Sequence, residues 1–245
     1  MLKIDAKGLH YKDLNERIWK ALESGERELE LINVNGQRYI ADGVGVHCKI
    51  DINGTPGDDL AAFMDGPEIT VYGDVQDGTG NTMNSGKVII HGDARDITGH
   101  SMRGGCILVK GNVGQRVGIH MKQYGNRFPV IIAGGTAGDF LGEYMAGGVV
   151  VILNLKEKDD VVGDWIGTGI HGGVIYIRAT VEEDYLGVGA VFGEFGDSDR
   201  KLLKPYLREF SSNFHCNFDK IIEDELVKIV PRSHRPFGDM YIDEG

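Results

Sequence analysis

The chain has 245 residues, of which 41% are hydrophobic and 26% are charged, which is typical of a globular protein with one large domain. Its formal net charge of −11 argues against a nucleic-acid-binding protein, because phosphate contacts need a basic face. Three scattered cysteines without metal or disulfide spacing (Cys48, Cys106, Cys216), the lack of a signal peptide and the lack of a long apolar run predict a cytoplasmic protein that does not contact membranes.

The first segment, residues 1–35, is predicted to be an N-terminal helical cap. Asp13 and Glu16 match a capping box, and Gly25 lies where a helix would stop. Apolar residues recur between them at helical spacing, at Leu14, Ile18 and Leu22. These features predict a helix over residues 13–24. Strand-like pieces between residues 28 and 56 are interpreted as the opening, degenerate circuits of a repeat.

The middle of the chain repeats itself. Met64, Met83, Met102 and Met121 are spaced 19 residues apart, and Met145 and Ile170 follow after 24 and 25 residues. A glycine lies three positions before each of the last five of these residues, at Gly80, Gly99, Gly118, Gly142 and Gly167. A small pair usually follows two residues later, as at Gly104-Gly105 and Gly147-Gly148, and an alternating apolar stretch comes after it. A fixed period of this kind indicates one structural unit stacked on its own copies.

The content of the unit identifies the architecture. Apolar residues alternate two by two, as in strands with one buried face, and frequent glycines keep each strand short. We therefore predict an all-β fold, a single-stranded right-handed β-helix over residues 36–196. Circuits would stack at the strand spacing of about 4.8 Å. The methionines should form an inward column, and the glycines should mark corners that need positive φ or a close approach of the backbone.

Residues 197–245 change character and are predicted to form C-terminal helices and an extended tail. Apolar residues between 202 and 214 indicate one helix that begins afresh near Pro205. A second set indicates another helix, at Phe218, Ile221, Ile222, Leu226 and Ile229. These helices would cover the other end of the β-helix or dock on a partner. The segment from Pro231 reads as an extended arm.

Two columns of polar residues follow the strands. Asp74, Asp93 and Asn112 occupy equivalent places, and Asp77, Asp96 and Gln115 form a second set. Paired carboxylates on a β-helix could bind calcium or cleave a glycosidic bond. The favoured interpretation is turn chemistry, in which Asp and Asn bond to their own backbone. The sequence therefore predicts no catalytic, cofactor-binding or metal-binding residue in this chain.

Other candidate features are weaker. Residues 167–172 match GxGxxG, but a strand rather than a helix is expected to follow, so the repeat explains these glycines. The histidines at 91, 100, 120 and 171 fall at different places in their repeats, and Phe and Tyr do not recur in register. The insertion between Met121 and Val130 is a candidate contact loop, because additions to a circuit form surface loops.

Several stretches carry a family resemblance. Residues 78–94 (GTGNTMNSGKVIIHGDA), 97–114 (ITGHSMRGGCILVKGNVG) and 134–153 (GGTAGDFLGEYMAGGVVVIL) resemble the glycine-repeat GXGXG domain that ends the large subunit of glutamate synthase. Residues 33–40 (NVNGQRYI) are similar to the archaeal-type split form, in which this domain is a separate polypeptide.

The resemblance implies a non-catalytic scaffold subunit in ammonia assimilation. Its partners would be a glutaminase (amidotransferase) subunit and an FMN-binding synthase subunit, which convert glutamine and 2-oxoglutarate to glutamate. FMN, an iron–sulfur cluster and NADPH or ferredoxin would belong to those partners. The glutaminase cysteine after the initiator Met is replaced here by Leu2, so no catalytic residue carries over.

Two alternatives remain open. The strict 19-residue rhythm also resembles the β-helical structural subunit of formylmethanofuran dehydrogenase. A carbohydrate-active β-helix enzyme that uses the Asp74 and Asp93 column ranks last, because no aromatic groove is visible in the sequence.

Overall fold

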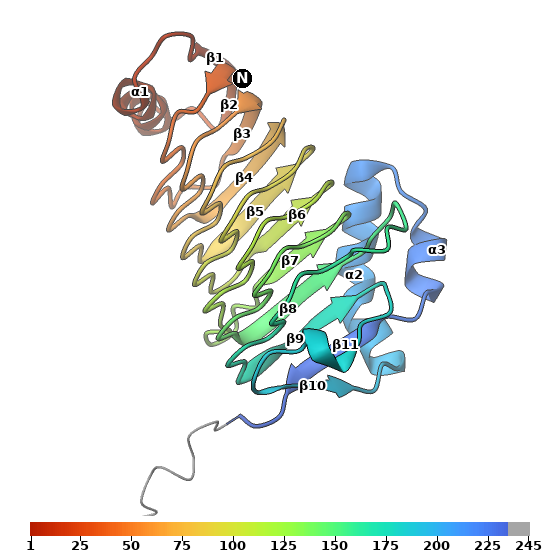
Figure 1. Cartoon of the computed structure of the whole chain (residues 1–245). Helices are drawn as coiled ribbons and strands as arrows, with labels where there is room; N and C mark the ends of the chain where they lie inside the picture. Colours follow the sequence, from red (N-terminus) through yellow and green to blue (C-terminus); the bar gives the residue numbers. More distant parts are fainter. Residues whose placement is uncertain (235–245) are drawn as a thin grey trace, which may run out of the picture.

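The computed structural model describes residues 1–234 and shows a β-solenoid whose strands stack into one sheet (Figure 1). Within residues 1–234 the sheet has 11 strands in the order β1-β2-β3-β4-β5-β6-β7-β8-β9-β11-β10. Strands β1 to β9 pair in parallel, one circuit after another. The predicted all-β solenoid with few helices is therefore confirmed. Within the described residues, no helix is both long and apolar enough to cross a membrane.

The strands are short, as the frequent glycines predict. Their bounds are β1 Leu2–Asp5, β2 Glu28–Asn35, β3 Lys49–Thr55, β4 Asp65–Tyr72, β5 Ser85–Ile90, β6 Cys106–Val109, β7 Val130–Ala133, β8 Ala146–Ile152, β9 Gly172–Ile177, β10 Ala190–Gly193 and β11 Val227–Pro231. The helices are α1 Tyr11–Glu23, α2 Asp197–Phe214 and α3 Phe218–Glu223, with one 3₁₀ turn at Glu183–Tyr185.

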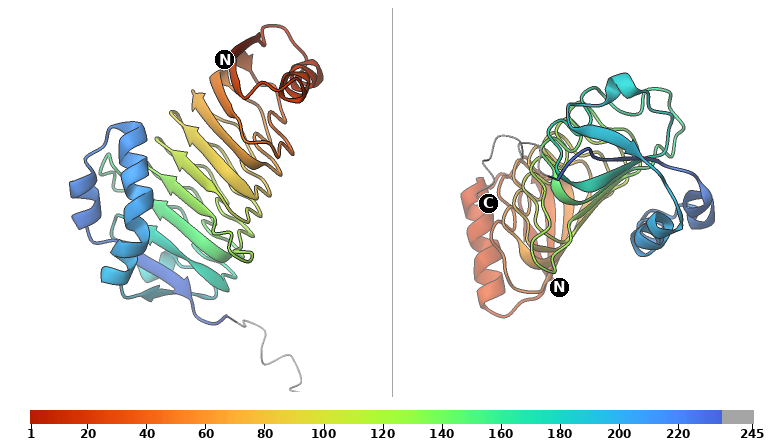
Figure 2. Two further views of the ribbon diagram at one scale, coloured as in Figure 1. Left: turned by 180° about the vertical axis from the view of Figure 1, so that it is seen from behind. Right: turned by 90° about the horizontal axis from the view of Figure 1, so that it is seen from below.

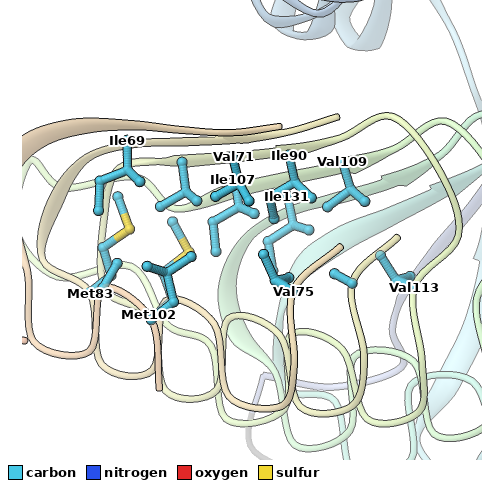
Figure 3. Packing of buried hydrophobic residues seen from close by; sticks show 14 of the residues in the cluster. Ile69, Val71, Val75, Met83, Ile90, Met102, Ile107, Val109, Val113 and Ile131 are labelled. Atoms are coloured by element: carbon cyan, nitrogen blue, oxygen red, sulfur yellow. The ribbon is translucent and has the colours of Figure 1, made fainter. Parts of the chain in front are cut away.

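The interior lies between the strands and the return segments, which join the end of one strand to the start of the next. The predicted methionine column is confirmed, because its members are fully buried at Met64, Met83, Met102, Met121 and Met145, with Ile170 completing the column. In Figure 3 the side chains of Met83 and Met102 face strand residues such as Ile69 and Ile107 across this interior. Flexible thioethers fit such a narrow, irregular space.

The repeated glycines lie along the return segments and point into this interior. Gly80, Gly99, Gly118, Gly142 and Gly167 all have positive φ, as predicted. A Cβ atom on Gly99 would lie 2.3 Å from Cδ1 of Ile131, so a side chain there would force Ile131 to shift. Ala61 takes the same conformation in an earlier circuit, where the register places the shorter Val88 in the position that Ile107 and Ile131 hold opposite Gly80 and Gly99. The glycine column is therefore required by both conformation and space.

At the N-terminal end, α1 covers the opening of the solenoid. Its buried face belongs to the same hydrophobic cluster as the methionine column, through Leu14, Ile18, Ala21 and Leu22. The helix begins two residues earlier than predicted, because Nδ1 of His10 accepts a hydrogen bond from the Lys12 amide and caps it. Strands β1 and β2 pair in register from Leu2 and Leu29, so the sheet extends into the segment interpreted as a helical cap.

The C-terminal segment differs from the prediction in two respects. Helix α2 does not begin afresh at Pro205 but runs through it, because Leu203, Leu207 and Phe210 all pack on the sheet and offset the backbone bond that proline cannot donate. Ile229 lies on β11 rather than on a helix, because β11 pairs antiparallel with the otherwise open edge of β9.

The two C-terminal helices, α2 and α3, cover a face of the solenoid rather than its end. Helix α2 packs on the outer face of the later strands, against Ile89, Leu108, Ile132 and Val151. Figure 2 shows α2 and α3 along one side of the sheet, with α1 at the far end. Strands β11 and β10 extend the sheet beyond β9. Of the predicted extended arm, Pro231 ends β11, and residues 235–245 lie outside the described residues.

Candidate functional site

In the return segments, the backbone alternates between left-handed and other conformations, and this alternation links each circuit to both of its neighbours. In the circuit of Met145, φ is positive at Phe140 (58°), Gly142 (69°) and Tyr144 (50°), whereas φ is not positive at the residues between them. The amide of Tyr144 donates to the carbonyl of Thr168 in the next circuit at 2.8 Å, whereas the amide of Gly142 donates back to Val117 at 2.8 Å. This alternation satisfies backbone groups toward both neighbouring circuits.

Bulky side chains occupy the outward positions of this backbone. Besides Phe140 and Tyr144, Trp165 (60°) and Phe63 (55°) have positive φ. Left-handed φ costs an L-residue about 1–2 kcal/mol, and Gly or Asn is the usual occupant. Aromatic residues are therefore kept here against the intrinsic preference of the backbone. Asp59, Ile97 and Arg116 have the same positive φ at equivalent places in other circuits, so the conformation belongs to the repeat.

The side chains of successive circuits stack along the solenoid. Phe140 and Trp165 stack with ring centroids 4.8 Å apart, and the guanidinium of Arg116 lies 4.6 Å from the Phe140 centroid on the preceding circuit. In a second stack, the rings of His120 and Tyr144 are 5.3 Å apart and nearly parallel. An ion pair between Arg116 and the buried Glu143 ties the two stacks together.

Two further exposed residues of the next turn extend this surface. Ile166 and Leu186 form a parallel β-bridge, which places the exposed Tyr185 next to Trp165. The carbonyl of Val188, which is also exposed, accepts a hydrogen bond from the Gly169 amide at 2.7 Å. We call the whole set the aromatic patch, which consists of Arg116, His120, Phe140, Tyr144, Trp165, Tyr185 and Val188.

The sequence analysis missed this patch. The expectation that Phe and Tyr do not recur in register was wrong for Phe63 and Tyr144, which hold equivalent places, and it left out tryptophan, since Trp165 holds the place of Phe140. The histidines do fall at different places in their repeats, but the rings of His100 and His120 still lie 6.0 Å apart. A search two positions to either side of each repeated glycine would have found the aromatic positions.

The aspartate columns fasten one circuit to the next. Oδ1 of Asp74 accepts from the Asp93 amide at 2.8 Å, and Oδ1 of Asp93 accepts from the Asn112 amide at 2.6 Å. The second column works in the same way, because Oδ1 of Asp77 accepts from Asp96 at 3.2 Å and Oδ1 of Asp96 accepts from Gln115 at 2.9 Å. The prediction that these groups bond to their own backbone was wrong in detail, because the stacked circuit offers the nearer amide.

The glycine that closes each strict unit makes room for these carboxylates. A Cβ atom on Gly92 would lie 2.2 Å from Oδ1 of Asp74, and one on Gly111 would lie 2.0 Å from Oδ1 of Asp93. The aspartates and glycines therefore form one structural device. Among residues 1–234, no group of three or more His, Cys, Asp and Glu side chains is arranged to hold a metal ion.

The GxGxxG match and the insertion after Met121 both form part of the solenoid framework. Gly167 and Gly169 have positive φ within a return segment, and Gly172 begins β9, so the GxGxxG match opens no helix, as expected. The insertion after Met121 forms a small hairpin between Tyr124 and Arg127. It folds back along the solenoid, where Arg127 forms an ion pair with Asp65 at 3.3 Å.

A buried polar network anchors the start of α2 beside an open cleft of about 1130 Å³. Oδ1 of Asp199 accepts from the hydroxyl of Tyr176 at 2.6 Å and contacts Nζ of Lys228 at 2.8 Å, and Oδ2 accepts from the Gly196 amide at 2.9 Å. Burial raises the pKa of Asp199, but the bonds from Lys228 and Tyr176 outweigh it and hold that pKa below its ordinary value. These groups satisfy one another, which indicates a structural role.

Comparisons with known proteins place this architecture in a family. The model of the GXGXG motif family matches residues 30–232. Protein MJ1350 of Methanocaldococcus jannaschii is 50% identical over 248 aligned positions, which cover 97% of this chain and 95% of that protein. Among solved structures, a chain of the formyltransferase/hydrolase complex FhcABCD from Methylorubrum extorquens, determined with methylofuran, superposes with a TM-score of 0.61 at 19% identity. That match covers 80% of this chain and 70% of the other, and it shows a shared fold.

Proposed function

Because the chain belongs to the GXGXG family, we propose that it is a non-catalytic scaffold subunit of a multi-subunit glutamate synthase. It would hold a glutaminase subunit and an FMN-binding synthase subunit in the cytoplasm, in a geometry that passes ammonia between them. The observation that carries this proposal is the family match over residues 30–232, nearly the whole solenoid. FMN, the iron–sulfur cluster and the NADPH or ferredoxin site would lie in the partners.

The use that the chain makes of its polar groups supports a scaffold. The most regular carboxylates, such as Asp74 and Asp93, accept backbone hydrogen bonds between circuits. The buried Asp199 network and the Arg116–Glu143 pair likewise join elements of the chain to one another. A rod of stacked circuits offers long side surfaces on which separate subunits can be held at fixed spacing.

Purification of the tagged chain from its native cytosol tests the proposal. The captured proteins would be identified by mass spectrometry, and the eluate scanned for flavin absorbance. We expect a glutaminase-like protein and an FMN protein, and glutamine-dependent glutamate formation should fall when the chain is left out of the reconstituted mixture. Recovery of the chain alone and colourless, or full activity without it, would overturn the proposal.

A second candidate is a scaffold subunit in a complex that transfers or hydrolyses formyl groups. The fold shared with a chain of the Methylorubrum extorquens complex favours it, although 19% identity extends only to the architecture. The same purification separates the two candidates. Formyl-transferring or formyl-hydrolysing subunits in place of a flavoprotein and a glutaminase would favour the second.

A further inference from the structure

Resting on the proposed scaffold function, we infer that the aromatic patch is the surface on which this chain docks a partner subunit. That partner is a different polypeptide, whose contact surface is apolar at its centre and basic at its rim. The patch lies on the return segments, whereas α2 packs on the outer face of the strands. Docking here therefore leaves the helical side of the solenoid free for another subunit.

The composition and exposure of the patch are those of an interface. Trp165 is 50% exposed, Tyr144 is 42% exposed and Val188 is 87% exposed, on neighbouring circuits. Clustered exposed apolar side chains mark interaction sites, and Trp, Tyr and Arg dominate binding hot spots. The stacks and the Arg116–Glu143 pair hold these side chains in place before any partner arrives, which lowers the entropy lost on binding.

The charge around the patch identifies the kind of partner. Exposed carboxylates surround Trp165 and Tyr185, at Asp164, Glu182, Glu183 and Asp184. The chain as a whole carries a formal charge of −11. Two copies meeting at this surface would bring like charges together, which disfavours self-association. A partner with Lys and Arg at its rim would gain from the same charges, both in specificity and in association rate.

The geometry of the rings argues against a carbohydrate ligand. Sugars bind to the open face of an aromatic ring, but both faces of Phe140 and of Tyr144 are already covered. Phe140 lies between Arg116 and Trp165. The ring of Tyr144 has His120 on one face and the backbone of Gly169 on the other, where a Cβ atom would lie 2.4 Å from Cδ1 of Tyr144. The edges of these rings are left for contact with a protein surface.

Glycine substitutions test the patch without straining the fold. Trp165→Gly and Tyr144→Gly remove a ring at positions with φ of 60° and 50°, which glycine adopts readily. Phe63→Gly is the matched control, because Phe63 has φ of 55°, is 54% exposed and occupies the place equivalent to Tyr144. It lies four circuits away, roughly 19 Å along the axis at the usual strand spacing.

The binding measurement uses the partner that the wild-type chain captures and that mass spectrometry identifies as a glutaminase or an FMN protein. We expect Trp165→Gly and Tyr144→Gly to weaken its affinity by about tenfold or more, as for hot-spot residues, and Phe63→Gly to change it less than about twofold. Hydrogen exchange at residues 139–145 and 163–170 should slow in the complex. Affinity should also fall as salt rises.

Several results would overturn the inference. Equal affinity of the Trp165→Gly and wild-type chains, or equal losses in Trp165→Gly and Phe63→Gly, would remove the patch as the docking surface while leaving the scaffold function intact. Dimerisation of the purified chain that Trp165→Gly abolishes would assign the patch to a second copy. Quenching of Trp165 fluorescence by cellohexaose, absent in Trp165→Gly, would assign it to a sugar. A wild-type chain that captures neither subunit would overturn the proposed function and this inference together.

Discussion

A single methyl group at Gly99 should destabilise the solenoid, and a second substitution should remove the steric part of that cost. Gly99 has φ of 72°, and a Cβ atom there would lie 2.3 Å from Cδ1 of Ile131 but 3.4 Å from its Cγ1. For Gly99→Ala, left-handed φ costs about 1–2 kcal/mol and overpacking a further ~1–3 kcal/mol. We therefore expect a total loss of roughly 2–5 kcal/mol in the free energy of unfolding.

Replacing Ile131 by valine removes the atom that the new methyl group would meet. Ile131→Val alone should cost about 0.5–1.5 kcal/mol, because it leaves a small cavity. In the double variant the remaining contact of 3.4 Å is an ordinary one, so the overpacking disappears. The two substitutions should then be coupled by about 1–3 kcal/mol. Ala61 with Val88 already provides the same pairing in an earlier circuit.

Urea unfolding followed by circular dichroism measures each corner of this cycle, provided that different probes give the same transition. The slope against urea should stay constant across the four proteins, because the exposed area changes little. If the cost of the double variant equals the sum of the single costs within about 0.5 kcal/mol, the steric explanation of the glycine column is refuted.

Three other perturbations follow from the structure. Gly105→Val should abolish soluble expression, because φ is 84° and its Cβ atom would lie 2.7 Å from the carbonyl oxygen of Gly86; a well-folded, soluble variant would contradict this. Asp93→Asn keeps its acceptor and should change the unfolding free energy by less than about 0.5 kcal/mol, whereas Asp93→Ala should cost about 0.5–1.5 kcal/mol in urea unfolding; equal effects would count against the carboxylate ladder. Burial, then the neighbouring cations, lowers the pKa of His91. The stability that neutral His91 contributes is present above its ordinary pKa of 6.5 and is lost as pH falls. The melting temperature should therefore drop less in His91→Phe than in the wild type between pH ~7.5 and ~5.5.

The repeat, the inward methionines and the glycine column could be predicted because each depends on residues of one circuit and its immediate copies. Ile229 could not be placed in the same way. It fits a helical pattern with Leu226 as well as a strand pattern, and the open edge of β9 decides between them. The prediction that a helix begins afresh near Pro205 was wrong for a related reason. The burial of Leu203 and Leu207 against the sheet outweighs the helix-breaking preference of proline.

The aromatic patch was hidden by the greater length of the later circuits and by the conformation of its residues. Later circuits are longer, so Phe140 and Trp165 are 25 positions apart rather than 19 and do not align in a fixed window. A positive φ at a tryptophan or phenylalanine is also not expected from the residue type. The sequence thus reveals glycines, which the backbone favours at such positions, but not aromatic residues, which it disfavours.

That contrast separates structural from functional positions on the return segments. The inward positions must hold glycine or alanine, because a larger side chain would meet the strand residues. The outward positions share the same left-handed backbone but face no such limit, as Asp59, Ile97, Arg116 and Trp165 show. Stability alone would favour glycine or asparagine there. The repeat thus accounts for the left-handed backbone at these positions but not for the gathering of exposed rings on neighbouring circuits, and it is this gathering that the proposed contact with another subunit would use.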